Sequence, residues 1–192
     1  LNKTPKYGND DDRADSLIMG MFEIIYNLVN GRPTPIGGQY RVEMLPTTCH
    51  VYFGAVTGAT PDGRKAGVAL SEGISPVQGA DKHGPTAVIK SAAKLDQLRT
   101  GGALLNQKFT PSVLAGERGL EGLKDLIRGY FKMDGHHIQF NVVDSDMLRD
   151  AQKHPEQYGD LIVRVAGYSD YFNNLTPALQ DEIILRTEQS GF

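Results

Sequence analysis

The chain has 192 residues, with 20 Lys or Arg against 23 Asp or Glu and a formal net charge of -3. This balance gives no electrostatic reason to expect binding to nucleic acid or to an anionic membrane. One cysteine excludes an internal disulfide framework and a cysteine-rich zinc site, and no apolar run reaches the roughly 18 residues of a membrane span, so we expect a cytoplasmic protein.

The first predicted element is a helix over residues 10–30. Asn9 is suited to cap its start, Asp10–Asp12 complement the helix dipole, and Gly31 with Pro33 ends it. Its apolar residues fall at helical spacing and form one broad face: Ala14, Leu17, Ile18, Met21, Ile24, Ile25 and Leu28.

Residues 40–53 are rich in β-branched and aromatic side chains, which predicts an extended strand with a kink at Pro46. In this context Cys49 is expected to be a buried, unreactive small hydrophobe. Sequence neighbours on a strand point to opposite faces, so His50 is poorly placed to activate Cys49 as a nucleophile. Residues 66–85 are rich in Gly and Pro and are expected to form loops.

The second half of the chain alternates between the two kinds of element. We expect helices over residues 86–98, 117–133 and 145–153, strands over 103–109, 136–143 and 161–166, and a last helix that begins at Pro177 after the cap residue Thr176. Strands separated by helices favour an α/β architecture.

The predicted strand over residues 136–143 has two different faces: Ile138, Phe140 and Val142 on one, and His137, Gln139 and Asn141 on the other. The row of Gln139 and Asn141 fits either a barrel lining that contacts a polar ligand or a half-solvated surface. His136 and His137 would point to opposite faces and could not share one ion, so no metal site is predicted.

One segment carries a specific resemblance. The run Arg164-Val-Ala-Gly167-Tyr168-Ser-Asp-Tyr-Phe172 resembles the C-terminal signature of the glycyl radical enzymes, and it lies a short distance before the end of the chain, as in that family. Further segments resemble the family along essentially the whole chain: residues 5–10, 45–50, 60–64, 72–78, 84–86 and 105–109.

The resemblance implies a mechanism in which Gly167 stores a radical on its α-carbon. A radical S-adenosylmethionine activase would install it, and no cofactor would be bound permanently. The stored radical would take hydrogen from a cysteine on another loop, and the resulting thiyl radical would take hydrogen from the substrate. Glycine suits this role because a Cβ would crowd the planar radical, and dense burial would protect the radical. Arg164, Tyr168 and Phe172 would position the loop.

The resemblance also implies a fold: the C-terminal part of a ten-stranded α/β barrel with a glycine radical loop and a C-terminal helix. Residues 1–135 would supply barrel segments and residues 136–192 the glycyl radical domain. Thr47, Thr48, Gln139 and Asn141 are the candidates for the substrate pocket. The implied partners are the activase, the remainder of the barrel and, for the full enzyme, a second copy in a homodimer. Anaerobic metabolism in the cytoplasm would follow.

The thiyl cysteine of the family lies far upstream of the glycine and is followed closely by Glu. Cys49 has Val51 two residues on, so that role is not assigned to it, and the thiyl cysteine is expected to lie outside this chain. A start at Leu1 instead of Met agrees with a longer polypeptide.

Ser169 and Asp170, together with the upstream segments, resemble the branch of dehydratases and C–X lyases, which includes hydroxyproline and glycerol dehydratases, more closely than the pyruvate formate-lyase branch. We therefore expect a lyase that eliminates water from a small hydroxylated substrate. Two alternatives stay open: an acyltransferase of the pyruvate formate-lyase type, and a non-catalytic spare-part subunit that restores a radical domain to a larger partner.

Overall fold

A computed structural model describes residues 3–192 as a mixed α/β structure built around a three-stranded parallel sheet in the order β2–β1–β5. Its strands are β1 (Leu105–Phe109), β2 (Ile138–Val142) and β5 (Glu188–Gln189). The long helix α4 (Gly116–Lys132) connects β1 to β2, as parallel pairing requires. A separate antiparallel hairpin consists of β3 (Ile162–Arg164) and β4 (Ser169–Tyr171).

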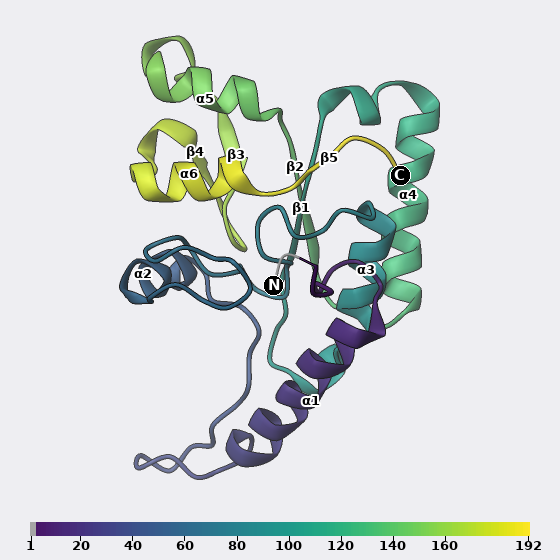
Figure 1. The fold of residues 1–192 in the computed structure, drawn as a ribbon, viewed down its shortest axis with the longest axis vertical. Helices are drawn as coiled ribbons and strands as arrows, with labels where there is room; N and C mark the ends of the chain where they lie inside the picture. The colour runs from purple at the N-terminus through teal and green to yellow at the C-terminus, as the bar shows by residue number, and fades with distance from the viewer. Residues whose placement is uncertain (1–2) are drawn as a thin grey trace.

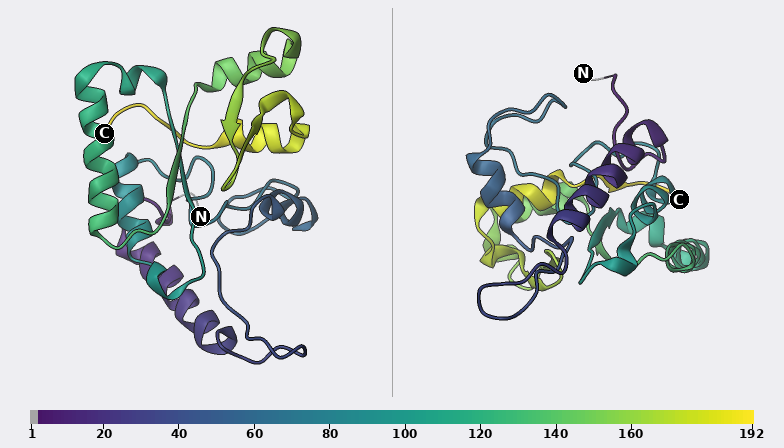
Figure 2. Two further views of the ribbon diagram at one scale, coloured as in Figure 1. Left: turned by 180° about the vertical axis from the view of Figure 1, so that it is seen from behind. Right: turned by 90° about the horizontal axis from the view of Figure 1, so that it is seen from below.

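The remaining helices lie on both sides of this sheet. They are α1 (Asp12–Val29), α2 (Cys49–Val56), α3 (Pro85–Ala93), α5 (Ser145–Lys153) and α6 (Pro177–Leu185), with short 3₁₀ turns at Gln97–Arg99, Pro111–Leu114, Pro155–Gln157 and Phe172–Asn174. Helices α3 and α4 cover one side of the sheet, and the hairpin lies with α5 and α6 on the other (Figure 1). Figure 2 shows the same arrangement from behind.

Two apolar cores follow from this layering. The first lies between the sheet, α3 and α4 and includes Leu105, Phe109 and Tyr130. The second lies among the hairpin, α5 and α6 and includes Val163 and Phe172. Because side chains alternate along a strand, β1 sends Leu105 and Phe109 into the first core and turns Asn106 and Lys108 toward the hairpin side.

Most of the elements predicted for the second half are confirmed. The structure has helices α3, α4 and α5 and strands β1, β2 and β3, all with ends no more than five residues from the predicted ones, and α6 begins at Pro177 with Thr176 at the N-cap position. Leu179, Ile183 and Ile184 of α6 are buried. Residues 66–84 form loops and turns, as predicted.

The strand predicted over residues 40–53 is wrong. Apart from one bridge residue, Met44, residues 40–48 are irregular, and residues 49–56 form helix α2. Tertiary packing outweighs the local preference for a strand here, because Gly54 lets the backbone of Ala69 approach to where a Cβ would be 2.5 Å away. On this helix Cys49 is exposed, so its predicted burial is also wrong.

Helix α1 forms where predicted but begins differently. Asp11 is the N-cap and accepts a hydrogen bond from the Arg13 amide at 3.0 Å, whereas the side-chain oxygen of Asn9 accepts from the amides of Lys82 and His83. The helix buries Asp15 and Phe22, and most of its apolar face is exposed: Leu17, Met21, Ile24, Ile25 and Leu28.

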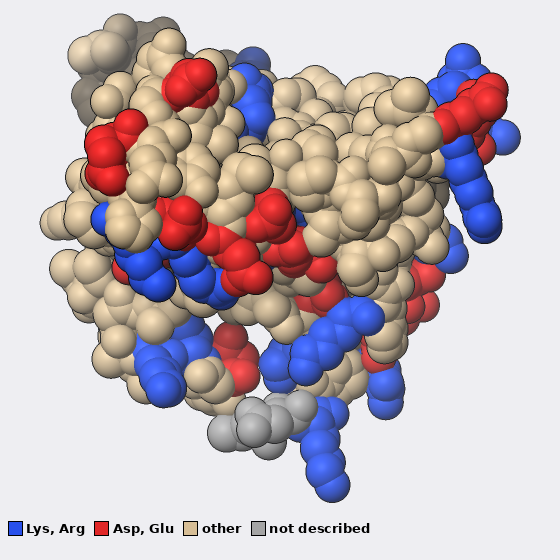
Figure 3. Space-filling view, turned by 90° about the horizontal axis from the view of Figure 1, so that it is seen from above, with Lys and Arg blue, Asp and Glu red and all other residues tan. Residues whose placement is uncertain are grey.

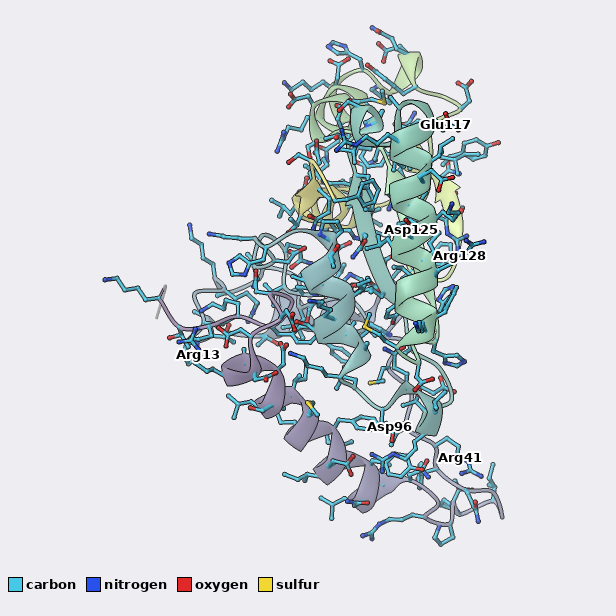
Figure 4. The ribbon with its side chains drawn as sticks, turned by 90° about the vertical axis from the view of Figure 1, so that its right-hand side faces the viewer. Arg13, Arg41, Asp96, Glu117, Asp125 and Arg128 are labelled. Atoms are coloured by element: carbon cyan, nitrogen blue, oxygen red, sulfur yellow. The ribbon has the colours of Figure 1, made fainter. Side chains whose placement is uncertain are left out.

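The surface is of mixed charge. On the face seen from above, acidic and basic side chains are interspersed with uncharged surface (Figure 3). Figure 4 shows Arg13 at the start of α1, and Arg41 and Asp96 near its far end. Within residues 3–192, no helix is both long enough and apolar enough to cross a membrane.

Candidate functional site

The signature glycine lies at the tip of the hairpin, in a tight turn that we call the Gly167 loop (residues 165–168). The Val165 amide donates to the Tyr168 carbonyl oxygen at 2.9 Å, which leaves Ala166 and Gly167 as the two turn residues. Gly167 has φ +80°, the left-handed conformation that a type II turn requires at this position and that favours glycine. Apart from its two chain neighbours, no atom of residues 3–192 lies within 4 Å of a Cβ built on Gly167, so within this part of the chain conformation and not space selects glycine.

Gly167 is exposed among the residues that the structure describes. The dense burial expected for this loop is therefore not supplied by residues 3–192. The nitrogen side of Gly167 is nevertheless anchored: its amide donates to Gln139 Oε1 at 3.2 Å. The loop thus holds the glycine by its N–H and leaves its α-carbon open.

Gln139 of β2 is the centre of this anchoring. The same Oε1 atom also accepts from Arg164 Nη2 at 3.0 Å, and its Nε2 atom donates to Asn106 Oδ1 and lies 3.5 Å from the Val165 carbonyl oxygen. Gln139 is 5% exposed. A buried amide with both ends satisfied has a fixed orientation, so it presents an acceptor and not a donor to Gly167.

Asn141, the next residue on the same face of β2, pairs with the backbone of the hairpin. Its Nδ2 atom donates to the Arg164 carbonyl oxygen and its Oδ1 atom accepts from the Arg164 amide, both at 2.8 Å. Opposite residues of two antiparallel strands exchange two backbone hydrogen bonds in the same way. Here the side chain of Asn141 takes the place of one backbone. The polar row that the sequence placed on one face of β2 therefore faces the Gly167 loop and is buried.

The three residues predicted to position the loop have different surroundings. The Arg164 side chain bonds Gln139 and donates to Ser169 Oγ at 3.1 Å. Phe172 is fully buried in the second core. Tyr168 is 39% exposed, and partial burial, followed by the charge of Asp170, raises the pKa of its hydroxyl above the ordinary value.

Helix α6 supplies support that the sequence did not reveal. Arg186 Nη2 donates to the Val165 carbonyl oxygen at 2.9 Å, and the same guanidinium forms a bidentate pair with Glu182. His50 Nε2 of α2 lies 3.5 Å from Glu182 Oε2. Burial opposes ionisation of Glu182, but His50 and Arg186 outweigh it and lower its pKa to about 2. The sequence does carry a signal for this support: Glu182 and Arg186 are oppositely charged and four residues apart, next to the apolar Ile183 and Ile184.

A second group of buried polar residues that the sequence did not indicate lies next to Gln139: Asn106, Glu72 and Ser75. Asn106 of β1 is the register partner of Gln139, and its Nδ2 atom donates to Glu72 Oε2, which also accepts from Ser75 Oγ at 3.0 Å. Glu72 is 2% exposed. Burial raises the pKa of Glu72, against the lowering effects of Arg186, Asn106 and Ser75.

Lys108, also on β1, ties the end of α6 to the sheet. Its ammonium donates to the Ile184 carbonyl oxygen at 2.8 Å and to Ser145 Oγ at 2.9 Å. Burial lowers the pKa of Lys108 to about 8, although Glu188 acts in the opposite direction.

The remaining sequence candidates lie elsewhere. Thr47 has φ +53° and donates to its neighbour's carbonyl, that of Pro46, while Thr48 is the N-cap residue of α2. Their place in a substrate pocket stays a prediction. His136 and His137 are exposed, and residues 3–192 contain no group of three His, Cys, Asp or Glu arranged to hold a metal ion.

Comparison with known proteins places these features in a family. Residues 70–173 match the family described as Glycine radical, and residues 1–54 match the family described as Pyruvate formate lyase-like. The chain is 64% identical over 189 residues to trans-4-hydroxy-L-proline dehydratase of Clostridioides difficile, covering 98% of this chain and 24% of that protein. It is 49% identical over 186 residues to indoleacetate decarboxylase of Tractidigestivibacter scatoligenes, covering 96% and 21%.

A solved structure agrees with the sequence match. The hydroxyproline dehydratase of Clostridioides difficile, crystallised with trans-4-hydroxy-L-proline bound, superposes with a TM-score of 0.95 over 98% of this chain and 24% of that one. This chain thus spans about a quarter of the length of these relatives. Because the Glycine radical match covers more than half of the residues and includes the Gly167 loop, the chain belongs to the glycyl radical enzyme family.

Proposed function

We propose that this chain is the C-terminal part of a glycyl radical dehydratase and that Gly167 stores its radical. The observation that carries the proposal is the geometry of the Gly167 loop. A glycine with φ +80° lies at a hairpin tip and its N–H is held by the buried Gln139. The described residues, its two neighbours apart, leave open the space where a Cβ would lie. Arg164, Tyr168 and Phe172 would position this loop.

In the proposed chemistry the activase removes one hydrogen atom from the α-carbon of Gly167, using a radical derived from S-adenosylmethionine. One unpaired electron then remains on that carbon, shared with the adjacent amide nitrogen and carbonyl. Gly167 recovers a hydrogen atom from a cysteine thiol outside this chain, and the thiyl radical takes a hydrogen atom from the substrate. Loss of water from the substrate radical and return of the hydrogen complete the cycle.

As substrate we propose trans-4-hydroxy-L-proline. The support is the 64% identity to a dehydratase of that compound, compared with 49% to indoleacetate decarboxylase. Enzymes with different reactions share this C-terminal segment, so the degree of identity and not the Gly167 signature carries the choice of substrate.

We further propose that the rest of a ten-stranded barrel covers the exposed apolar surfaces. Leu17, Met21 and Ile25 of α1 line a groove of about 1500 Å³ that also includes Met44 and Leu45. A contiguous apolar surface of this kind is typical of an interface. The rest of the barrel would also bury the exposed Gly167. In addition, we expect the full enzyme to be a homodimer.

The proposed division of the chain is into barrel segments over residues 1–135 and a glycyl radical domain over residues 136–192. It is supported by the two cores: the buried residues of the first extend to Tyr130 and those of the second begin at Val143, while Ile138 and Phe140 pack against the first and Val51 against the second. Strands β2 and β5 both pair with β1 and would join the two parts.

The test is electron paramagnetic resonance after anaerobic incubation of the full enzyme with its activase and S-adenosylmethionine. We expect an organic radical whose hyperfine splitting collapses when glycine is deuterated at its α-carbon. Gly167→Ala should abolish the signal, whereas Gly67→Ala should keep it. Gly67 is a matched control because it has the same φ of +80° and open space where a Cβ would lie. An unchanged signal in Gly167→Ala would refute the radical assignment.

The substrate is tested separately with the activated enzyme. We expect trans-4-hydroxy-L-proline to be consumed with loss of one water molecule, and glycerol to be left unchanged. Radical formation without turnover of trans-4-hydroxy-L-proline would overturn the proposed substrate and keep the proposed radical site.

A further inference from the structure

A directed chain of hydrogen bonds runs from the Gly167 loop into the interior, and we call it the amide chain: Gly167, Gln139, Asn106 and Glu72. The Gly167 amide donates to Gln139, Gln139 donates to Asn106, and Asn106 donates to the carboxylate of Glu72. Every bond points the same way, from the glycine to the buried carboxylate.

The strand register produces this alignment. Asn106 of β1 and Gln139 of β2 are direct partners in the parallel pair, so their side chains leave the sheet next to each other on the hairpin side. Both are buried, at 8% and 5% exposure. If either side-chain amide flipped by itself, a donor would face a donor or an acceptor would face an acceptor within the amide chain.

The two ends of the amide chain agree on its direction. At the inner end, Glu72 Oε2 accepts from both Ser75 Oγ and Asn106 Nδ2, so Asn106 turns its NH₂ group to Glu72 and its oxygen to Gln139. Gln139 must then present its NH₂ group to Asn106 and its oxygen to the Gly167 amide. The Gly167 amide and the Arg164 guanidinium, which both point at Gln139 Oε1, can only donate, so the outer end of the chain requires the same order.

We propose that Gln139 is a positioning residue for the radical glycine and that Glu72, acting through Asn106, fixes the orientation of the Gln139 amide. The inference rests on the proposed radical function of Gly167. Its consequence is that the nitrogen of Gly167 stays in place while hydrogen leaves or returns at the α-carbon, which is open.

The first experiment compares two substitutions of buried glutamines in the full enzyme. Gln139→Leu removes the acceptor for Gly167, whereas Gln107→Leu is the matched control. Gln107 is also 5% exposed, but it lies on β1 and its side chain donates to the Pro85 carbonyl oxygen instead. We expect about tenfold less radical per chain in Gln139→Leu and a wild-type level in Gln107→Leu.

A spectroscopic readout separates positioning from folding. In the wild-type radical, electron–nuclear double resonance should detect the exchangeable amide proton of Gly167 with a coupling that reports its fixed direction. In Gln139→Leu this coupling should broaden or shift, and in Gln107→Leu it should not. Thermal unfolding of both variants checks that the fold is retained.

The second experiment reverses the amide chain. Gln139→Glu can still accept from Gly167 but cannot donate to Asn106, so its radical yield should fall. In the double variant Glu72→Gln/Gln139→Glu, the new amide at position 72 can donate to a reversed Asn106, which can donate to the new carboxylate at position 139. We expect the double variant to recover most of the radical lost in Gln139→Glu, although each substitution alone disturbs the chain.

The outcomes are distinguishable from failure of the proposed function. If the wild-type enzyme gives no radical that Gly167→Ala removes, the radical function fails. If the wild-type enzyme gives that radical and Gln139→Leu gives the same yield and the same amide-proton coupling, the positioning role is overturned. A folded double variant no better than Gln139→Glu would overturn the role of Glu72.

Discussion

Individual glycines in this chain are required for different physical reasons. Gly167 has a left-handed backbone with free space around it, whereas a Cβ on Gly73 would lie 2.3 Å from the Leu104 carbonyl oxygen in addition to a φ of +53°. At Gly167 a side chain meets only backbone strain, while at Gly73 it also meets a fixed backbone atom. Alanine substitutions at Gly167 and Gly73 can therefore separate the requirement for backbone conformation from the requirement for space.

We expect Gly167→Ala to lower the free energy of unfolding by about 1–2 kcal/mol, the cost of a left-handed alanine. Gly73→Ala should cost more, because the backbone around Leu104 must shift. Urea unfolding of the two variants beside the wild type checks this order. Equal losses would contradict the open space that the structure shows around Gly167 and the close approach of Leu104 to Gly73.

Lys108 gives a prediction about pH. Because its folded-state pKa is about 8 against an ordinary value of 10.5, the unfolded chain binds more protons between these two pH values. The contribution of Lys108 to the free energy of unfolding therefore rises with pH between about 8 and 10.5, by at most about 3 kcal/mol. Urea unfolding of the wild type and Lys108→Met at pH 7.5, 9 and 10.5 measures the difference. A difference between the two proteins that stays constant with pH would contradict the lowered pKa.

Helix α6 supports the β3–β4 hairpin through its side chains. Its Arg186 reaches the carbonyl oxygen of Val165, and its Glu182 is buried between Arg186 and His50 of α2. Three elements distant in sequence thus meet next to the Gly167 loop. The buried ion pair makes this junction sensitive to loss of one partner and tolerant of loss of both.

We expect Arg186→Met to destabilise the protein by about 3 kcal/mol, since it leaves the Glu182 carboxylate buried without its cation. The double variant Glu182→Met/Arg186→Met should recover part of that loss. Arg128→Met is the control, because Arg128 is an exposed residue of α4 (Figure 4). Chemical denaturation measures all three, and a double variant less stable than Arg186→Met would show that Glu182 stabilises the fold without Arg186.

At the scale of elements, the sequence predicted β2 and its two faces but not the environment of those faces. Period-two alternation showed that Gln139 and Asn141 share a side, which the structure confirms. It could not show that this polar side is the buried one and that the apolar residue Val142 is exposed. Burial of amides depends on partners in β1 and β3, which local periodicity does not contain.

At the scale of the whole molecule, helix α1 leaves most of its apolar face uncovered. Leu17, Met21, Ile24 and Leu28 are between 55% and 69% exposed, although they form one apolar stripe. A stripe of this kind on a helix normally packs against another element. Within the proposed enzyme, that element would be the remainder of the barrel.

We therefore expect residues 1–192 produced alone to self-associate, and the double variant Leu17→Gln/Ile24→Gln to be more monomeric. Sedimentation velocity at several concentrations measures this. In the full enzyme the same variant should instead lower the thermal midpoint by several degrees, because it places polar groups in a buried interface. A monomeric wild-type chain together with an unaffected full enzyme would exclude α1 from such an interface.

The sequence by itself determined the family signature around Gly167, the α/β character and most elements after residue 85. These features depend on local patterns: helical or strand periodicity, caps, and a glycine in a specific run of residues. The tertiary structure alone decided that residues 49–56 form a helix, that Gln139 and Asn141 hold the Gly167 loop, and that Arg186, Glu182 and Glu72 support it. Such partners are set by strand register and helix packing over long sequence separations, and these act on the chain only once it has folded.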